Sequence, residues 1–202
     1  MKKHEISNLL NHLAKTKERN IVLVDFANVD RWQESLGWSI GVRKLGQLTK
    51  HLSAGKKFLR RFYYGLDYGP KDTSTHLTYW SESIHAQAQY SGFEIISKRV
   101  KYIHDNNYAT GFTKKCNLDI EMSVDLIKEA NNYDRAIIFS GDGDLAYVFE
   151  YIHNELGKEV YAFCVRGHIG KELIEAKSNG IINNILFAED FEYRLNLRRK
   201  TI

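Results

Sequence analysis

Two apolar segments that end in aspartate constrain the fold more than any other feature of this sequence. The segment "IVLVDF" from Ile21 delivers Asp25, and "AIIFSGDGD" from Ala136 delivers Asp142 and Asp144. Uninterrupted apolar runs of this length are typical of strands buried on both faces of a parallel sheet. Since the carboxyl ends of parallel strands meet at one edge of a sheet, we expect these acids at the same edge.

The remaining segments alternate between helical and strand patterns. Helices are expected at 3–16, 40–52, 76–90, 118–130, 145–156 and 171–178, and strands at 21–26, 57–66, 92–103, 135–140 and 159–165, followed by a short apolar segment at 181–187. The polar, glycine-containing residues 104–117 are expected to form a loop. Strands that alternate with helices predict an α/β fold with a mainly parallel central sheet and helices on both faces.

Composition indicates a folded protein outside the membrane. The sequence is 43% hydrophobic with a single proline, as in folded proteins. Its length of 202 residues favours a single domain that spans residues 1–202 and ends in a short basic tail. No apolar segment approaches the roughly 20 residues of a membrane helix, so we expect a cytoplasmic protein without a membrane partner. A homo-oligomer is compatible with the sequence. Cys116 and Cys164 show no CxxC spacing and the histidines no HxxxH pair, so a metal would have oxygen ligands.

Positive charge is distributed in separate clusters. The net charge is +4, which is compatible with a polyanionic partner without requiring one. The clusters are "KKFLRR" from Lys56, "SKRVK" from Ser97, "KK" at Lys114 and Lys115, and "LRRK" near the C-terminus. Solvated lysines that flank strands are the alternative interpretation of each cluster.

The run "GDGDLA" has the glycine spacing of a dinucleotide-binding turn but the wrong charge. Asp142 and Asp144 would repel a pyrophosphate that such a turn binds with backbone N–H groups. Asp119, at the start of a predicted helix, is a third acid that this edge of the sheet could receive. Clustered carboxylates repel one another unless a cation neutralises them, and Mg²⁺ takes such oxygen ligands together with substrate phosphates. Gly141 and Gly143 are expected to allow the tight turn.

Each acid also has a purely structural interpretation. Asp144 and Asp119 each precede or start a helix and could be N-caps, and Ser140 is similarly ambiguous. Asp25 could be an end-of-strand turn residue, although a buried unpaired carboxylate requires compensation. Asp125 lies about 120° around an ideal helix from Asp119, so spacing alone does not place both on one ion, and it could instead act through water or hold a lysine.

Three blocks of the sequence together resemble the NYN family, the PIN-like nuclease domains found in bacterial LabA-type proteins and eukaryotic RNA regulators. The blocks are "VLVDFANV", "CNLDIEMSVDLI" and "IIFSGDGDLAYV", and the resemblance spans roughly residues 20–187. It implies a three-layer, flavodoxin-like fold of PIN type, a carboxylate cluster that binds Mg²⁺ or Mn²⁺, and ribonuclease activity. Lys115 departs from the family pattern because it stands four residues before Asp119 instead of close to it.

The resemblance also assigns roles to residues. Asp25, Asp119 and Asp142 would be the metal ligands, Asn28 and Ser140 supporting polar groups, Asp144 a further ligand or water-positioning group, and Asp125 an additional acid at the family's six-residue interval.

Metal-assisted hydrolysis of an RNA phosphodiester would follow, with single-stranded RNA as the partner. Seven basic residues are expected to steer the RNA backbone: Arg60, Arg61, Lys98, Arg99, Lys101, Lys114 and Lys115. Three aromatic residues are expected to stack on unpaired bases: Tyr102, Tyr108 and Phe112. Ordinary packing is the alternative for the aromatic residues. The main competing hypothesis is a nucleic-acid-binding or regulatory module without turnover. A haloacid-dehalogenase-type phosphatase is disfavoured because Ala27 stands where its second acid is needed.

Overall fold

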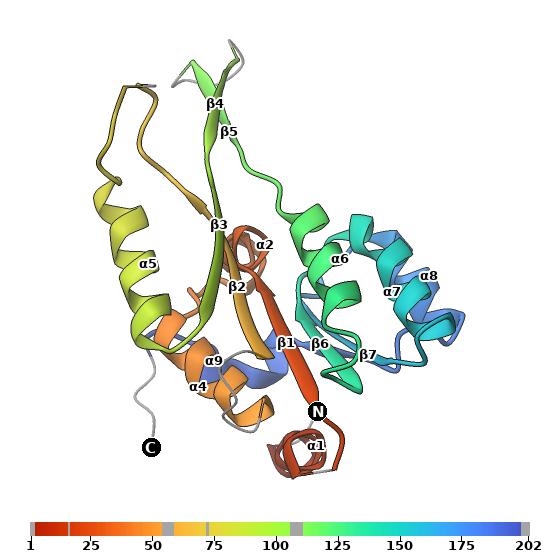
Figure 1. Ribbon diagram of the computed structural model, residues 1–202. Helices are drawn as coiled ribbons and strands as arrows, with labels where there is room; N and C mark the ends of the chain where they lie inside the picture. The colour runs from red at the N-terminus through yellow and green to blue at the C-terminus, as the bar shows by residue number, and fades with distance from the viewer. Residues whose placement is uncertain (1–2, 16, 54–58, 72, 106–110, 199–202) are drawn as a thin grey trace.

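A six-stranded parallel sheet forms the centre of the molecule, in the order β3-β2-β1-β6-β7-β8 (Figure 1). The computed structural model describes the chain except residues 1–2, 16, 54–58, 72, 106–110 and 199–202. The strands are β1 (Asn20–Asp25), β2 (Arg60–Leu66), β3 (Glu94–Arg99), β6 (Arg135–Phe139), β7 (Glu159–Cys164) and β8 (Asn184–Phe187). Every neighbouring pair is parallel. The order reverses between β1 and β6, and such a switch point is where open α/β sheets bind ligands.

Helices cover both faces of the sheet, which makes the expected three layers. The helices are α1 (Lys3–Lys15), α2 (Phe26–Arg31), α3 (Gln33–Leu36), α4 (Val42–Leu52), α5 (Tyr79–Tyr90), α6 (Asp119–Lys128), α7 (Ala146–Asn154), α8 (Lys171–Ser178) and α9 (Glu192–Leu195), with 3₁₀ turns at Gly143–Leu145 and Ala188–Phe191. One face is covered by α1, α4, α5 and α9, and the other by α6, α7 and α8 (Figure 1). Among the described helices, none has the length and apolarity needed to cross a bilayer.

Strand β1 shows why the apolar run is uninterrupted. Val22 and Val24 pack into the core on one face of the sheet, while Ile21 and Leu23 pack into the core on the other. Successive side chains of a strand point to opposite faces, so a central strand between two helical layers needs apolar residues at every position. The chain therefore has two apolar cores, with β1 between them.

Residues 92–103, expected as one strand, form two. β3 ends at Arg99, and β4 (Lys101–His104) pairs antiparallel with β5 (Phe112–Lys115) in a separate two-stranded sheet. The expectation of a loop throughout 104–117 is thus wrong for His104 and for residues 112–115. The short segments "KYIH" and "FTKK" contain few apolar residues, so their pairing depends on backbone hydrogen bonds that carry little pattern in sequence.

Two short helices after β1 were also not expected. The chain enters α2 at Phe26, directly after Asp25, and continues into α3. The predicted helices and the other predicted strands are present, the helix at 171–178 with the expected bounds and the others with shifted ends. Residues 57–58 of the expected strand 57–66 lie outside the described part of the chain.

Candidate metal centre

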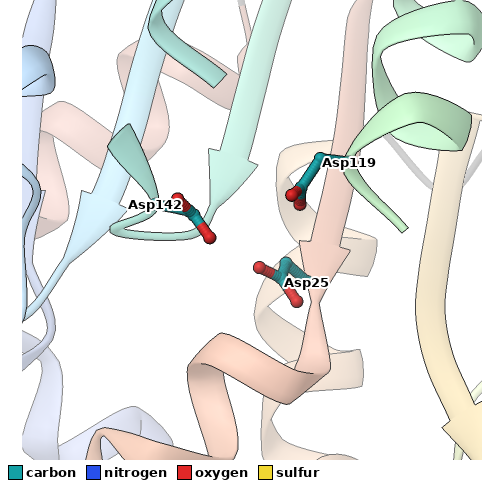
Figure 2. A group of neighbouring side chains, drawn as sticks. All are labelled: Asp25, Asp119 and Asp142. Carbon is teal, nitrogen blue, oxygen red and sulfur yellow. The ribbon is translucent and has the colours of Figure 1, made fainter. Parts of the chain in front are cut away.

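Three carboxylates meet at the edge of the sheet where β1 and β6 end (Figure 2). Asp25 is the last residue of β1, Asp142 follows β6, and Asp119 is the first residue of α6. One carboxylate oxygen from each lies within 4.8 Å of the other two. The parallel register between β1 and β6 explains the meeting of Asp25 and Asp142, because both strands end at the same level.

Asp25 is buried and fixed on both sides. Its Oδ1 accepts a hydrogen bond from the backbone N–H of Asn28 at 3.2 Å, which caps α2, and its Oδ2 accepts one from the Ser140 hydroxyl at 3.0 Å. Burial raises the pKa of Asp25 to about 6, and the charges of Asp119 and Asp142 act in the same direction. A buried carboxylate of this kind favours a proton or a cation.

Ser140 and Asn28 hold the loop that carries Asp142. The Ser140 hydroxyl accepts a hydrogen bond from the Asp142 amide at 3.1 Å. The Asn28 side-chain oxygen accepts from the Gly141 amide at 2.9 Å and from the Trp32 indole at 2.7 Å. Both polar residues are buried and connect β1 and α2 to the loop after β6. They orient the acids without belonging to the carboxylate group.

Close packing against backbone requires glycine at Gly141, and Gly143 lies against the flexible side chain of Glu172. A Cβ at Gly141 would overlap the carbonyl oxygen of His168, and one at Gly143 would overlap the carboxylate of Glu172. Neither glycine has a positive φ. The loop after β7 therefore packs against the turn at Gly141, and the start of α8 packs against it at Gly143.

Asp119 is not the N-cap of its helix. It is the first helical residue, and its amide donates to the side-chain oxygen of Asn117 at 2.9 Å. Burial and then the charge of Asp142 raise the pKa of Asp119. Its carboxylate is thus available to the cluster.

Asp144 is not a cap either. The capping residue of the 3₁₀ turn is Asp142, whose Oδ1 accepts from the Asp144 amide at 3.1 Å. The Asp144 side chain is exposed and lies outside the group of three, although its charge contributes to the raised pKa of Asp119. It stands at the periphery of the site.

Residues 19–185 match the model of the NYN domain. The chain belongs to the NYN domain family. It is 31% identical over 97 residues to the low amplitude and bright protein LabA of Synechococcus elongatus, a match that covers 46% of this chain and 50% of that protein. The chain thus aligns with about half the length of this curated relative.

A solved structure has the same fold. A protein of unknown function from Vibrio parahaemolyticus superposes with a TM-score of 0.61 at 22% identity, over 90% of this chain and 97% of the other. The resemblance to the NYN family and the expected α/β architecture are therefore both confirmed.

Asp125 of this NYN domain does not join the carboxylate group. Its Oδ2 accepts a hydrogen bond from the Tyr63 hydroxyl at 2.7 Å and lies 3.4 Å from an amino group of Arg61. The partner foreseen as a lysine is an arginine on β2. Asp125 thus ties α6 to the sheet beneath it.

Arg60 and Arg61 lie at the start of β2, on the edge opposite the cluster, and both are buried. Arg60 donates to the carbonyl oxygens of Gly46, Ser91 and Gly92 at 3.0 to 3.3 Å. Arg61 forms ion pairs with Glu94 at 2.9 Å and Glu129 at 2.7 Å. Their expected role in steering RNA does not fit this placement, because both guanidinium groups are buried and bound to groups of the fold itself.

The other predicted basic residues lie at the site's edge of the sheet. Lys98 and Arg99 end β3, Lys101 is on β4, and Lys114 and Lys115 are on β5. Lys98 forms an ion pair with Glu121, and Arg99 lies over the ring of Tyr68 at 4.6 Å.

The aromatic residues of this segment pack against one another. Phe112 is 36% exposed and contacts Tyr102 and His104 edge-on, with ring centroids 6.2 and 5.6 Å apart. Tyr108 lies outside the described residues.

A cleft of about 490 Å³ opens above the three acids. Residues that sequence reasoning missed line it beside Lys114 and Lys115, among them Asp30, Arg31 and Tyr64. The sequence contained one signal for the first two, since they follow Asp25 within "FANVDR" on what proved to be α2.

The donor set suits a hard divalent cation. Three carboxylates supply only oxygen ligands, and one of them is buried with a raised pKa. Magnesium-type ions are bound by such groups while keeping room for waters and phosphate oxygens, which the cleft provides.

Proposed function

We propose that this NYN domain is a metal-dependent ribonuclease that hydrolyses RNA phosphodiester bonds. The observation that carries the proposal is the group of Asp25, Asp119 and Asp142, whose oxygens lie within 4.8 Å of one another at the sheet's switch point. Repulsion among three carboxylates costs the fold stability, and arrangements of this kind are found where function requires them. Membership of a family of nuclease-like domains supports the same conclusion.

The three acids would hold Mg²⁺ or Mn²⁺. Such an ion, when bound, supplies charge neutralisation at the phosphate and lowers the pKa of a coordinated water. Ser140 keeps Asp25 and the Asp142 loop in register through its two hydrogen bonds, and Asn28 holds Gly141. These supports fix the acids before substrate arrives, which is the condition for electrostatic catalysis. Asp144, at the periphery, would act on water or on an incoming group.

Single-stranded RNA is the proposed substrate. Lys98, Arg99, Lys101, Lys114 and Lys115 surround the cleft or its approach, so a polyanion would be attracted to the edge that carries the acids. Phe112, which is partly exposed, would contact an unpaired base, whereas Tyr102 is held by its hydrogen bond to Asp67. Arg60 and Arg61 have no part in this path because both are buried at the other edge.

A cleavage assay tests the proposal. Labelled single-stranded RNA is incubated with the protein in Mg²⁺, Mn²⁺ or EDTA, and we expect cleavage that EDTA abolishes. Asp142→Asn preserves size and removes one ligand charge, so turnover should fall by about two orders of magnitude or more. Glu150→Gln is the matched control, since Glu150 is exposed on α7 and away from the acids, and should retain full activity.

Two results would contradict the nuclease. Cleavage that Asp142→Asn leaves unaltered would come from a contaminant or another site. Tight RNA binding by the wild type without cleavage in either metal would instead favour a regulatory module that keeps the acids without turnover.

A further inference from the structure

A basic hairpin stands beside the carboxylate cleft. β4 and β5 form a sheet of their own, and it projects beyond the edge of the central sheet (Figure 1). Its register pairs Lys101 with Lys115 and Tyr102 with Lys114. A two-stranded hairpin alone is at best marginally stable in water. Contacts with the rest of the fold must therefore hold it.

Asp67, just after β2, fastens the base of the hairpin. Its Oδ1 accepts a hydrogen bond from the Tyr102 hydroxyl and its Oδ2 one from the Lys114 ammonium, both at 2.7 Å. The Asp67 side chain is only 12% exposed, which makes a carboxylate without partners costly. Although burial opposes it, these donors hold the pKa of Asp67 below its usual value. One face of the hairpin is thus committed to the body of the protein.

The other face presents two lysines side by side. Lys101 and Lys115 are direct cross-strand partners, and each is adjacent to a residue that faces Asp67, so both point away from it. Like charges directly opposite destabilise an antiparallel pair. Within the described part of the chain, neither ammonium is paired with a carboxylate. The arrangement weakens the hairpin until an anion neutralises it.

One lysine of this pair, Lys115, borders the carboxylate cleft. Lys115 lines the same cleft of about 490 Å³ as Asp25, Asp119 and Asp142. An extended polyanion bound along the hairpin could therefore continue past Lys115 into the cleft that holds the acids.

We propose that Lys101 and Lys115 form a phosphate-binding fork for the backbone of a single strand that runs along the hairpin into the cleft. Lys114 is instead a fastening residue, held by Asp67. That the strand is RNA rests on the proposed ribonuclease function, whereas the phosphate chemistry follows from the hairpin itself. Bound phosphates remove the repulsion between the two lysines and release counterions.

Salt-dependent binding tests the fork in the full chain. Affinity for a labelled single-stranded RNA is measured in EDTA across a salt series for the wild type and for Lys101→Gln/Lys115→Gln. Loss of two phosphate contacts should flatten the slope of log K against log salt by about 1.4, at ~0.7 per contact. The ratio of wild-type to variant affinity then changes about sevenfold between about 50 and about 200 mM salt.

Lys50→Gln/Lys128→Gln is the matched control. Both lysines are exposed at the ends of α4 and α6, on the opposite edge of the sheet, and their removal changes net charge equally. We expect the wild-type slope from this variant. A melting temperature that still rises with Mn²⁺ shows that the fork variant keeps its carboxylate cluster.

Asp67→Asn separates fastening from binding. It keeps Lys101 and Lys115 and releases the Lys114 ammonium, so the slope should not flatten, while hydrogen exchange at residues 101–104 and 112–115 should accelerate. A wild-type salt slope in the Lys101→Gln/Lys115→Gln variant would overturn the fork. So would a loss of affinity for RNA without a loss of affinity for single-stranded DNA of the same sequence, since phosphate contacts do not sense the 2′-hydroxyl.

The two proposals fail separately. If RNA binding depends on Lys101 and Lys115 but no cleavage is seen, the ribonuclease proposal fails and the fork proposal stands. If the fork variant cleaves and binds RNA as the wild type does, the fork proposal fails and the ribonuclease proposal stands.

Discussion

Replacing Asp25 by asparagine should make the metal-free protein more stable while abolishing the proposed RNA cleavage. The pKa of Asp25 rises from 3.8 to about 6 because the carboxylate is buried beside Asp119 and Asp142. This rise corresponds to about 3 kcal/mol of cost to the folded state at neutral pH. Asp25→Asn removes the charge that causes this cost.

The sign of the pH dependence follows from the raised pKa. Between about pH 4 and about pH 6 the folded state binds the Asp25 proton more tightly than the unfolded state, so stability falls as pH rises through this range. Below about pH 4 the group is protonated in both states and the cost disappears. The advantage of Asp25→Asn should thus be largest at pH 7 and vanish near pH 4.

The gain at pH 7 should lie between about 1 and about 3 kcal/mol. The amide oxygen still accepts from the Asn28 N–H, but an amide group replaces the oxygen that accepts from Ser140, and one such hydrogen bond contributes about 1 kcal/mol. For a chain of this size, each kcal/mol of added stability raises the melting temperature by about 2–4 °C, so the melting temperature of Asp25→Asn should rise by roughly 2–12 °C.

Denaturant unfolding in EDTA at pH 7 and pH 4 measures this directly. Asp144→Asn is the matched control, because Asp144 is exposed and outside the group of three, and its stability should change little. An Asp25→Asn variant that is less stable than wild type at pH 7, or whose gain persists at pH 4, would refute the electrostatic reasoning.

Three further predictions concern the cluster and its supports. In thermal melts, millimolar Mn²⁺ or Mg²⁺ should raise the wild-type melting temperature more at pH 7 than at pH 5, since Asp25 must lose its proton to bind the ion. Asp142→Asn should remove most of this rise. In cleavage assays, Asp25→Asn/Asp142→Asn should cost little more turnover than either single change, because ligands of one ion are not additive; additive losses would argue for separate sites. Arg61→Met leaves three carboxylates without their arginine and should destabilise the fold by about 3–5 kcal/mol, while the salt slope of RNA binding stays unchanged in a titration.

Local pattern in the sequence predicted the parts of this fold that depend on local rules. The run from Ile21 to Val24 had to be a central strand, because a segment apolar at every position requires cover on both faces. Alternation of such runs with helices then determined a parallel sheet, and parallel strands determined that Asp25 and Asp142 share an edge. The start of α6 at Asp119 agreed with the expected helix boundary.

The role of each charge depended on partners far apart in sequence. Arg61 looked like a surface cation, but its partner Glu129 is separated from it by 68 residues. The same interaction network removes Asp125 from the acids that meet at the site. No spacing rule carries this information, because a charge becomes structural only when folding buries it beside its partner.

The hairpin and the close approach at Gly141 belong to the tertiary structure for the same reason. β4 and β5 have no strong apolar alternation, and what holds them is Asp67, 35 residues before Tyr102 and 47 before Lys114. Gly141 could be predicted as a turn residue from sequence. That only glycine fits there follows from the carbonyl oxygen of His168, which lies against it in the loop after β7. Sequence alone determined which strands and acids share an edge, since periodicity and chain direction are local; the tertiary structure decided which charges stay free there, since burial and pairing are properties of the whole fold.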